Sequence, residues 1–108
     1  MLRHVALFRF KPETTDDQIE AAVDALSTLP DQIDVLRRFR FGPDAGITED
    51  TWDFAVVAVL DGAEDYAIYR DHPSHVAVLR DYVAPLISEA ARIQFESEGE
   101  SPSRTPGS

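Results

Sequence analysis

Two of the three histidines of this chain lie in a single seven-residue stretch, Tyr69–His75, which also contains a proline. A neutral imidazole can accept a proton near pH 7, and a phenol can donate a hydrogen bond. Tyr69 and His75 are therefore candidate catalytic residues, with His75 as the general base. A histidine beside a helix start is also a common structural cap, so a purely structural role for the stretch stays open.

A helix break is predicted in the middle of this stretch. Proline lacks an amide hydrogen and keeps the residue before it out of the helical region. A first helix should therefore end near Asp71, and a second should begin at Pro73 with His72 or Asp71 near its cap. His75 then lies in the first turn, where the positive helix end and partial burial both disfavour imidazolium. We expect its pKa to lie below the usual value of about 6.5.

The same residues offer a third possibility, a metal site built from Asp71, His72 and His75. Paired histidine ligands normally share one face of a regular helix, and Pro73 separates these two across a helix break. The sequence therefore argues against this site, and we expect no metal and no cofactor.

The composition limits the classes of function. The chain has 108 residues, which is the size of one domain, and a net charge of −10. That charge argues against nucleic acid and anionic membranes as partners. The absence of cysteine excludes thiol catalysis and disulfides. No apolar run approaches the length of a membrane span, so the expected location is cytoplasmic. Residues 97–108, rich in Ser, Glu, Pro and Gly, are predicted to form a disordered tail after a domain at 1–96.

The elements that must position the histidine stretch follow from hydrophobic periodicity and turn signals. Thr15 and Gln18 form a capping-box pattern at the start of a first helix, which Pro30 is expected to close. Pro85 is expected to kink or divide a later helix near Tyr82. Strands are predicted at Leu2–Phe10, Val35–Phe41, Trp52–Leu60 and Ala91–Phe95, and the later helices at Ala63–Arg70 and Pro73–Ala90.

This order of elements predicts an α+β fold of the ferredoxin-like split βαβ type, a four-stranded antiparallel sheet with helices on one face. The first strand places His4, Ala6 and Phe8 on one face, yet its other face is apolar too, as in the strand Trp52–Leu60. A second copy of the sheet would cover that other face. We therefore expect a homodimer, a dimeric α/β barrel whose interior can hold a small ligand.

Three segments carry a family resemblance: Arg3–Lys11, the turn His72-Pro73-Ser74-His75, and Tyr82–Leu86. Together they resemble the stress-responsive α/β-barrel domain family, often called Dabb, and the likeness covers nearly all of residues 1–96. The resemblance implies a dimeric α/β barrel. The family includes plant stress-associated proteins and many bacterial members without a known role.

The resemblance also implies two alternative functions. One is a dimer that binds a small hydrophobic or aromatic ligand without catalysis. The other follows plant polyketide cyclases of the olivetolic acid cyclase type, which perform aldol chemistry without a cofactor and whose tyrosine and histidine match Tyr69 and His75. The enzyme requires His75, Tyr69 and His4 to converge on an enclosed, open cavity, whereas a cavity filled by Phe8, Phe54 or Trp52 would favour the binding protein. The candidate ligand-binding residues are His4, Phe8, Phe54 and His72.

Overall fold

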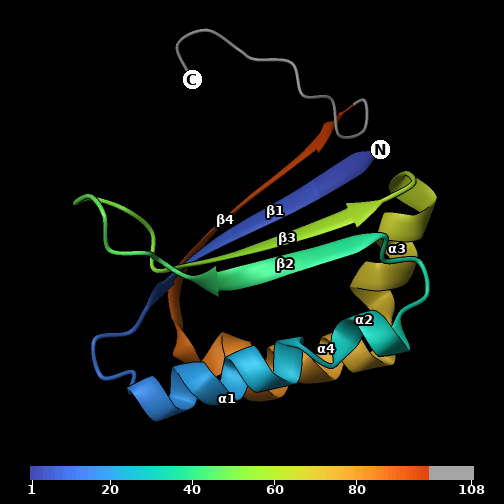
Figure 1. Cartoon of the computed structure of the whole chain (residues 1–108). Coiled ribbons are helices and arrows are strands. Elements are labelled where there is room, and N and C mark those ends of the chain that lie inside the picture. The colour runs from blue at the N-terminus through green and yellow to red at the C-terminus, as the bar shows by residue number, and fades with distance from the viewer. Residues whose placement is uncertain (98–108) are drawn as a thin grey trace, which may run out of the picture.

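The computed structural model describes residues 1–97, which form a four-stranded antiparallel sheet with helices on one face (Figure 1). The strand order is β2-β3-β1-β4. The central strands are β1 (Leu2–Phe10) and β3 (Phe54–Leu60), and the edge strands are β2 (Arg38–Pro43) and β4 (Ile87–Glu96). This arrangement confirms the predicted α+β, ferredoxin-like fold.

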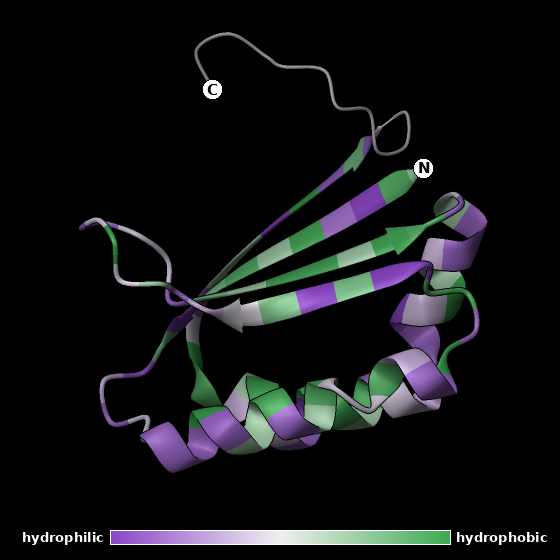
Figure 2. Ribbon diagram, in the orientation of Figure 1, coloured by the Kyte–Doolittle hydropathy of each residue, from purple (hydrophilic) through white to green (hydrophobic). Residues whose placement is uncertain are grey.

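The covered face of the sheet follows from period-two alternation along the strands. In β1, the side chains of His4, Ala6 and Phe8 are buried, while the residues between them are partly exposed. β3 repeats the pattern with Phe54 and Val56. Figure 2 shows hydrophobic and hydrophilic residues alternating along β2. The alternation orients the buried set towards the helices and leaves the other set on the open face of the sheet.

The first helix, α1 (Asp16–Leu26), begins with the predicted capping box. The Thr15 hydroxyl accepts the Gln18 N–H at 3.2 Å, and the Gln18 side-chain oxygen accepts the Thr15 N–H at 2.9 Å. The prediction that Pro30 closes this helix is wrong, because α1 already ends at Leu26. Pro30 lies in the first turn of a separate short helix, α2 (Leu29–Gln32), where a missing amide hydrogen costs nothing.

The predicted break at Pro73 is confirmed, and the helices on either side are α3 (Ala63–Asp71) and α4 (Pro73–Val78). α4 continues as a π-helical turn at Leu79–Val83 and a 3-10 turn at Ala84–Leu86. The prediction of one helix extending to Ala90 is wrong. The helical path ends at Leu86, because the next residues pair with β1 as the start of β4.

The two strands of the β2–β3 hairpin are also displaced from their predicted bounds. β2 begins at Arg38 instead of Val35, because the chain before it makes a turn in which the Leu36 N–H bonds the Ile33 carbonyl. β3 begins at Phe54 instead of Trp52. Asp53 immediately precedes this strand and is hydrogen-bonded to the end of β1. Its N–H donates to the Phe8 carbonyl, and its carboxylate accepts the Phe10 N–H at 2.8 Å.

Ser97, which the sequence prediction assigns to the tail, is hydrogen-bonded to the start of β1. The Ser97 N–H donates to the Met1 carbonyl at 2.8 Å, and the Met1 amino group donates to the Ser97 carbonyl at 2.7 Å. The Ser97 hydroxyl accepts a hydrogen bond from Arg3 Nε at 2.8 Å. The rest of the predicted disordered tail lies outside the described residues. Within residues 1–97, no helix is long and apolar enough to cross a membrane.

The sheet face opposite the helices is open in the single chain (Figure 1), and apolar side chains meet at its centre. The register aligns Val57, Val5 and Ile93 across β3, β1 and β4. Ile93 is 58% exposed and Phe95, on the same face of β4, is 44% exposed. Large exposed apolar side chains grouped on one face are typical of a protein–protein contact.

Candidate functional site

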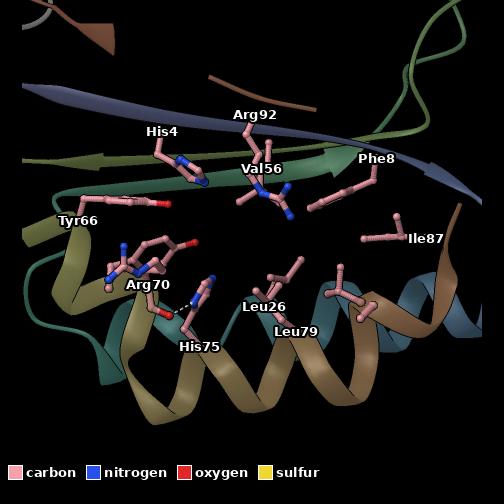
Figure 3. Close-up of a pocket in the computed structure, with 14 residues that line it drawn as sticks. His4, Phe8, Leu26, Val56, Tyr66, Arg70, His75, Leu79, Ile87 and Arg92 are labelled. Carbon is pink, nitrogen blue, oxygen red and sulfur yellow. Dashed lines mark hydrogen bonds between the residues drawn. The ribbon is translucent and has the colours of Figure 1, made fainter. Parts of the chain in front are cut away.

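A cavity of about 290 Å³ lies between the covered face of the sheet and the helices (Figure 3). The sequence prediction places a ligand in the interior of a barrel formed by two sheets. The cavity lies instead within one chain, on the sheet face that the helices cover, and not on the open face that would form the barrel. It exists because the sheet and the helix layer leave a space between β1, α3 and α4. One half of its lining is polar or charged and comprises His4, Tyr66, Tyr69, Arg70, His75 and Arg92.

The two histidines and two tyrosines of the polar half form a compact cluster. The His75 ring lies 4.2 Å from that of Tyr69 between centroids, and the His4 ring lies 4.9 Å from that of Tyr66. His4 and Tyr69 are 6.4 Å apart. β1 supplies His4, α3 supplies both tyrosines, and α4 supplies His75. Segments distant in the sequence thus bring four groups able to form hydrogen bonds to one end of the cavity.

The local sequence explains how His75 reaches this cluster. His72 is extended, with φ −61° and ψ 133°, as expected for a residue before proline. Its Nδ1 accepts the Ser74 N–H at 3.1 Å and so caps α4, while Pro73 occupies the first turn. The chain therefore turns sharply between α3 and α4, which orients the His75 side chain back towards Tyr69.

The hydrogen bond of His75 determines which of its nitrogens carries the proton. Nδ1 lies 3.0 Å from the Arg70 carbonyl oxygen. A carbonyl only accepts, so Nδ1 is the donor and Nε2 of the neutral ring keeps its lone pair. Burial lowers the pKa of His75 below its usual value, and the nearby His72 adds to this, although the bond to Arg70 opposes it. His75 is thus a neutral base with a free acceptor nitrogen.

His4 has the opposite hydrogen-bonding arrangement. The amide nitrogen of Gln94 lies 2.7 Å from His4 Nδ1 and donates to it, which leaves the proton of the neutral ring on Nε2. Burial lowers the pKa of His4, and the positive charge of Arg92 and the proximity of His75 lower it further. His4 is therefore a hydrogen-bond donor on the side of its ring away from Gln94.

Tyr69 is a donor as well. Its side chain is 2% exposed, and this burial, together with Tyr66, raises the pKa of its phenol well above the usual value. The phenol keeps its proton at neutral pH and can donate it in a hydrogen bond. The polar end of the cavity thus combines one base, His75, with donors from His4 and Tyr69, an arrangement suited to holding or polarising an oxygen atom.

The other half of the cavity is apolar. Figure 3 shows Phe8 and Val56 on the sheet side facing Leu26 and Leu79 on the helix side. Such walls accept a hydrocarbon or an aromatic ring, and they leave orientation to the polar end. The apolar lining residues are Ala6, Phe8, Leu26, Val56, Leu79, Val83, Ala84 and Ile87.

Four of the six site residues predicted from the sequence line this cavity, and two do not. His4, Phe8, Tyr69 and His75 are in the lining. Phe54 is buried and packs against Phe10 with ring centroids 5.9 Å apart, outside the cavity lining. His72 caps α4 and is not in the lining.

Trp52, one of the aromatic side chains that could have filled the cavity, lies elsewhere. Its ring packs beneath the guanidinium of Arg9, 4.4 Å away, so it leaves the cavity open.

Sequence reasoning missed three polar residues of the cavity, Tyr66, Arg70 and Arg92. A signal existed for Tyr66 and for Arg92. Tyr66 lies three residues before Tyr69, which is the spacing of neighbours on a helix face. Arg92 falls on the strand face opposite Ala91, Ile93 and Phe95.

The alternative of a metal site is not supported by the geometry. Within residues 1–97, no group of three or more histidine, cysteine or acidic side chains is arranged to hold a metal ion. The three residues considered for it have other partners. Asp71 forms an ion pair with Arg70 at 2.8 Å, and the Nδ1 atoms of His72 and His75 are both bonded to backbone groups.

Comparison with known proteins gives one family and several related structures. The model of the stress responsive A/B barrel domain family matches residues 2–97. An uncharacterised protein of Streptomyces coelicolor is 29% identical over 94 residues, which cover 82% of this chain and 97% of that protein. A dimeric ferredoxin-like protein of unknown function from Thermobifida fusca is 44% identical, with a TM-score of 0.82 over 87% of this chain and 88% of that one.

A hydroxynitrile lyase from Passiflora edulis has the same fold, with a TM-score of 0.77 over 94% of this chain and 96% of the lyase. At 15% identity this likeness concerns the fold alone.

Proposed function

Because the chain belongs to the stress responsive A/B barrel domain family, we propose that it binds a small hydrophobic or aromatic compound in the cavity between its sheet and its helices. The observation that carries this proposal is the division of the cavity into an apolar half and a cluster of hydrogen-bonding side chains. Ligand sites in proteins typically combine apolar walls with a few convergent polar groups. The volume of about 290 Å³ favours a compound of one or two rings.

We further propose that the functional unit is a homodimer. Support comes from the open apolar face around Val57, Ile93 and Phe95, and from the dimeric state of the 44% identical protein from Thermobifida fusca. Pairing of this face would leave the cavity accessible, since the two lie on opposite faces of the sheet. Each subunit would then carry one complete site.

Ligand binding is testable with 2-naphthamide, a neutral two-ring probe, by isothermal titration calorimetry. We expect saturable binding that Ala6→Leu weakens at least tenfold, because the added side chain would extend into the cavity from β1. Ala63→Leu, at an exposed position in α3, is the matched control and should leave binding unchanged. Thermal unfolding of both variants checks that the fold persists. Equal binding by Ala6→Leu and the wild type would place the probe elsewhere and reject the proposal.

The second candidate function is a cofactor-independent, polyketide cyclase-like enzyme. The specific observation in its favour is the contact between Tyr69 and His75 with His75 Nε2 left free. In this reaction Nε2 would take a proton from a carbon next to a ligand carbonyl. The resulting enolate would attack a second carbonyl, forming a carbon–carbon bond, while the protonated Tyr69 phenol donates a hydrogen bond to the oxygen that gains charge. The proton on His75 would then return to the new alkoxide.

The first step of such a reaction is measurable without knowing the substrate. Phenylacetone in D₂O exchanges its benzylic protons slowly, and its loss of ¹H NMR signal reports their removal. A positioned base contributes about 10²–10⁴-fold to such a step, so His75→Ala should return the exchange to the rate in buffer. Arg80→Ala, at a surface ion pair, should behave as the wild type. A wild-type rate equal to that in buffer would reject the catalytic candidate and leave the binding function standing.

A further inference from the structure

We propose that the ligand of this cavity carries a carboxylate, which binds the Arg92 guanidinium and the Nε2–H of His4. This inference rests on the proposed binding function and specifies its ligand as an aromatic or other compact apolar carboxylic acid. It assigns a binding role to Arg92, a side chain that sequence reasoning did not select.

The position of Arg92 directs its charge into the cavity. In the sheet register it lies opposite Ala6 of β1, and Gln94 lies opposite His4, so both β4 side chains share the face that the helices cover. Alanine has no long side chain to occupy the space above it. Figure 3 shows Arg92 reaching from β4 into the cavity, between His4 and Phe8.

The cavity contains one other arginine, Arg70, and its charge is already paired. Arg70 donates two hydrogen bonds to the carboxylate of Asp71, at 2.8 and 2.9 Å. Among residues 1–97, Arg92 forms no such ion pair with a carboxylate, so its planar guanidinium is available to a ligand. A guanidinium matches a carboxylate with two parallel hydrogen bonds, which is the geometry that a carboxylic acid ligand supplies.

His4 provides the second contact. Gln94 donates to its Nδ1 and so places a proton on Nε2. The influence of the Arg92 charge on the pKa of His4 indicates that the two groups are close. A carboxylate accepts up to four hydrogen bonds, so it can take donors from both side chains at once. A neutral carbonyl ligand would satisfy His4 but would form no ion pair with Arg92, whose side chain is exposed to solvent and reaches the cavity lining.

The remaining geometry limits the rest of the ligand. A carboxylate held at Arg92 and His4 leaves the apolar half of the cavity for a ring, enclosed by side chains such as Phe8, Val56 and Leu79. An acidic protein with a net charge of −10 repels anions in general. The positive charge of Arg92 therefore favours binding of small carboxylic acids whose apolar part fits the cavity.

The test compares two probes of equal shape, 2-naphthoate and neutral 2-naphthamide, by isothermal titration calorimetry at low salt. The wild type should bind the naphthoate about tenfold more tightly, as expected for a charge-assisted pair that is partly exposed to solvent. Arg92→Gln should abolish this preference by lowering the affinity for naphthoate to about that for naphthamide. Arg80→Gln, which removes an arginine paired to Asp81 on the surface, is the matched control and should keep the preference.

The outcomes separate this inference from the proposed function. Equal affinity of the wild type for both probes would overturn the role of Arg92 and leave ligand binding in place. If Arg92→Gln still preferred naphthoate, the role of Arg92 would likewise be overturned and ligand binding would remain in place. Failure of both probes to bind would overturn the inference together with the binding function.

Discussion

At the scale of single residues, the site depends on two histidines that the fold keeps neutral. His75 is 8% exposed and His4 is 7% exposed, and each has one ring nitrogen bonded to a neutral group. Burial is the main reason that both have a lowered pKa. Protonating either ring would bury a charge without a counterion, which costs free energy. The residues that give the cavity its chemistry therefore also make the fold sensitive to acid.

This sensitivity predicts a loss of stability in mild acid. Above about pH 6.5 the two histidines are neutral both folded and unfolded, so they contribute no pH dependence. As the pH falls below that value, the unfolded chain binds protons first, and stability declines until the folded pKa values are reached. The melting temperature should therefore fall between about pH 7 and about pH 5. A Tm that stays flat or rises over this range would contradict the burial of the two rings.

His75→Asn provides the matched comparison, because asparagine keeps a polar side chain but does not titrate. Its Tm should depend less steeply on pH over the same range, whatever its absolute value. Three exposed carboxylates have a lowered pKa: Asp61, Asp71 and Asp81. They titrate below this pH range, so they do not contribute to the change in Tm between about pH 7 and about pH 5. A variant with the wild-type slope would assign the effect to other groups.

At the scale of elements, the turn between α3 and α4 positions the site. His72 ends one helix and caps the next, and its ring nitrogen takes the place of the usual serine or aspartate oxygen. The sequence predicts His72 both near the cap and as a ligand-binding residue. The contact with Ser74 N–H accounts for the first role, and the absence of His72 from the cavity lining leaves the second without support.

The cap predicts a specific pattern of stability. His72→Ala should destabilise the protein by about 1 kcal/mol, the usual cost of losing an N-cap. This corresponds to a decrease of about 4–8 °C in Tm for a domain of this size. His72→Asn should restore most of the loss, since asparagine is a strong N-cap. If both variants melted as the wild type does but bound naphthamide more weakly, His72 would be a ligand contact instead of a cap.

Elements determined by local sequence were predictable, and those determined by distant pairing were not. The capping box at Thr15 and the break at Pro73 depend on residues within one turn, and both are found as predicted. The end of the last helix depends on Phe10, which pairs with Ile87 from the far end of the domain. The residues around Ile87 contain no local pattern from which this pairing could be predicted.

The same distinction holds for the site. Tyr69 and His75 are close in sequence, so their contact could be expected. Arg92 enters the cavity only because β4 lies beside β1, a relation that the strand's own alternation does not reveal. The tautomers of His4 and His75 likewise depend on Gln94 and on a backbone carbonyl, which become partners only in the folded chain.

At the scale of the whole molecule, the two faces of the sheet differ in what covers them. The helix-covered face holds the cavity, and the open face presents Val5, Val57 and Ile93 in one row across the central and edge strands. Val57 lies on the open face, whereas Phe54, also in β3, lies in the core. Association through the open face is therefore separable from the site.

Dimerisation predicts a mass of twice 12.0 kDa by light scattering coupled to size-exclusion chromatography. Ile93→Asp should shift the protein towards the mass of one chain, because an unpaired charge would be buried in the interface. Val76→Asp replaces an exposed valine on α4 and is the control, with no change in mass expected. A wild type that remains monomeric at micromolar concentration would contradict this assignment of the open face.

The strand order also has a consequence for how the chain reaches its folded state. β1 lies between β3 and β4, so Leu2 pairs with Leu60 on one side and with Glu96 on the other. During synthesis β1 leaves the ribosome before both of its partners, and only the β2–β3 hairpin joins neighbouring strands. Folds dominated by such distant pairings form slowly, and their strand edges stay unpaired meanwhile. β1 can therefore pair with β3 once Leu60 has emerged, but its other edge stays unpaired until β4, which ends at Glu96, has been synthesised.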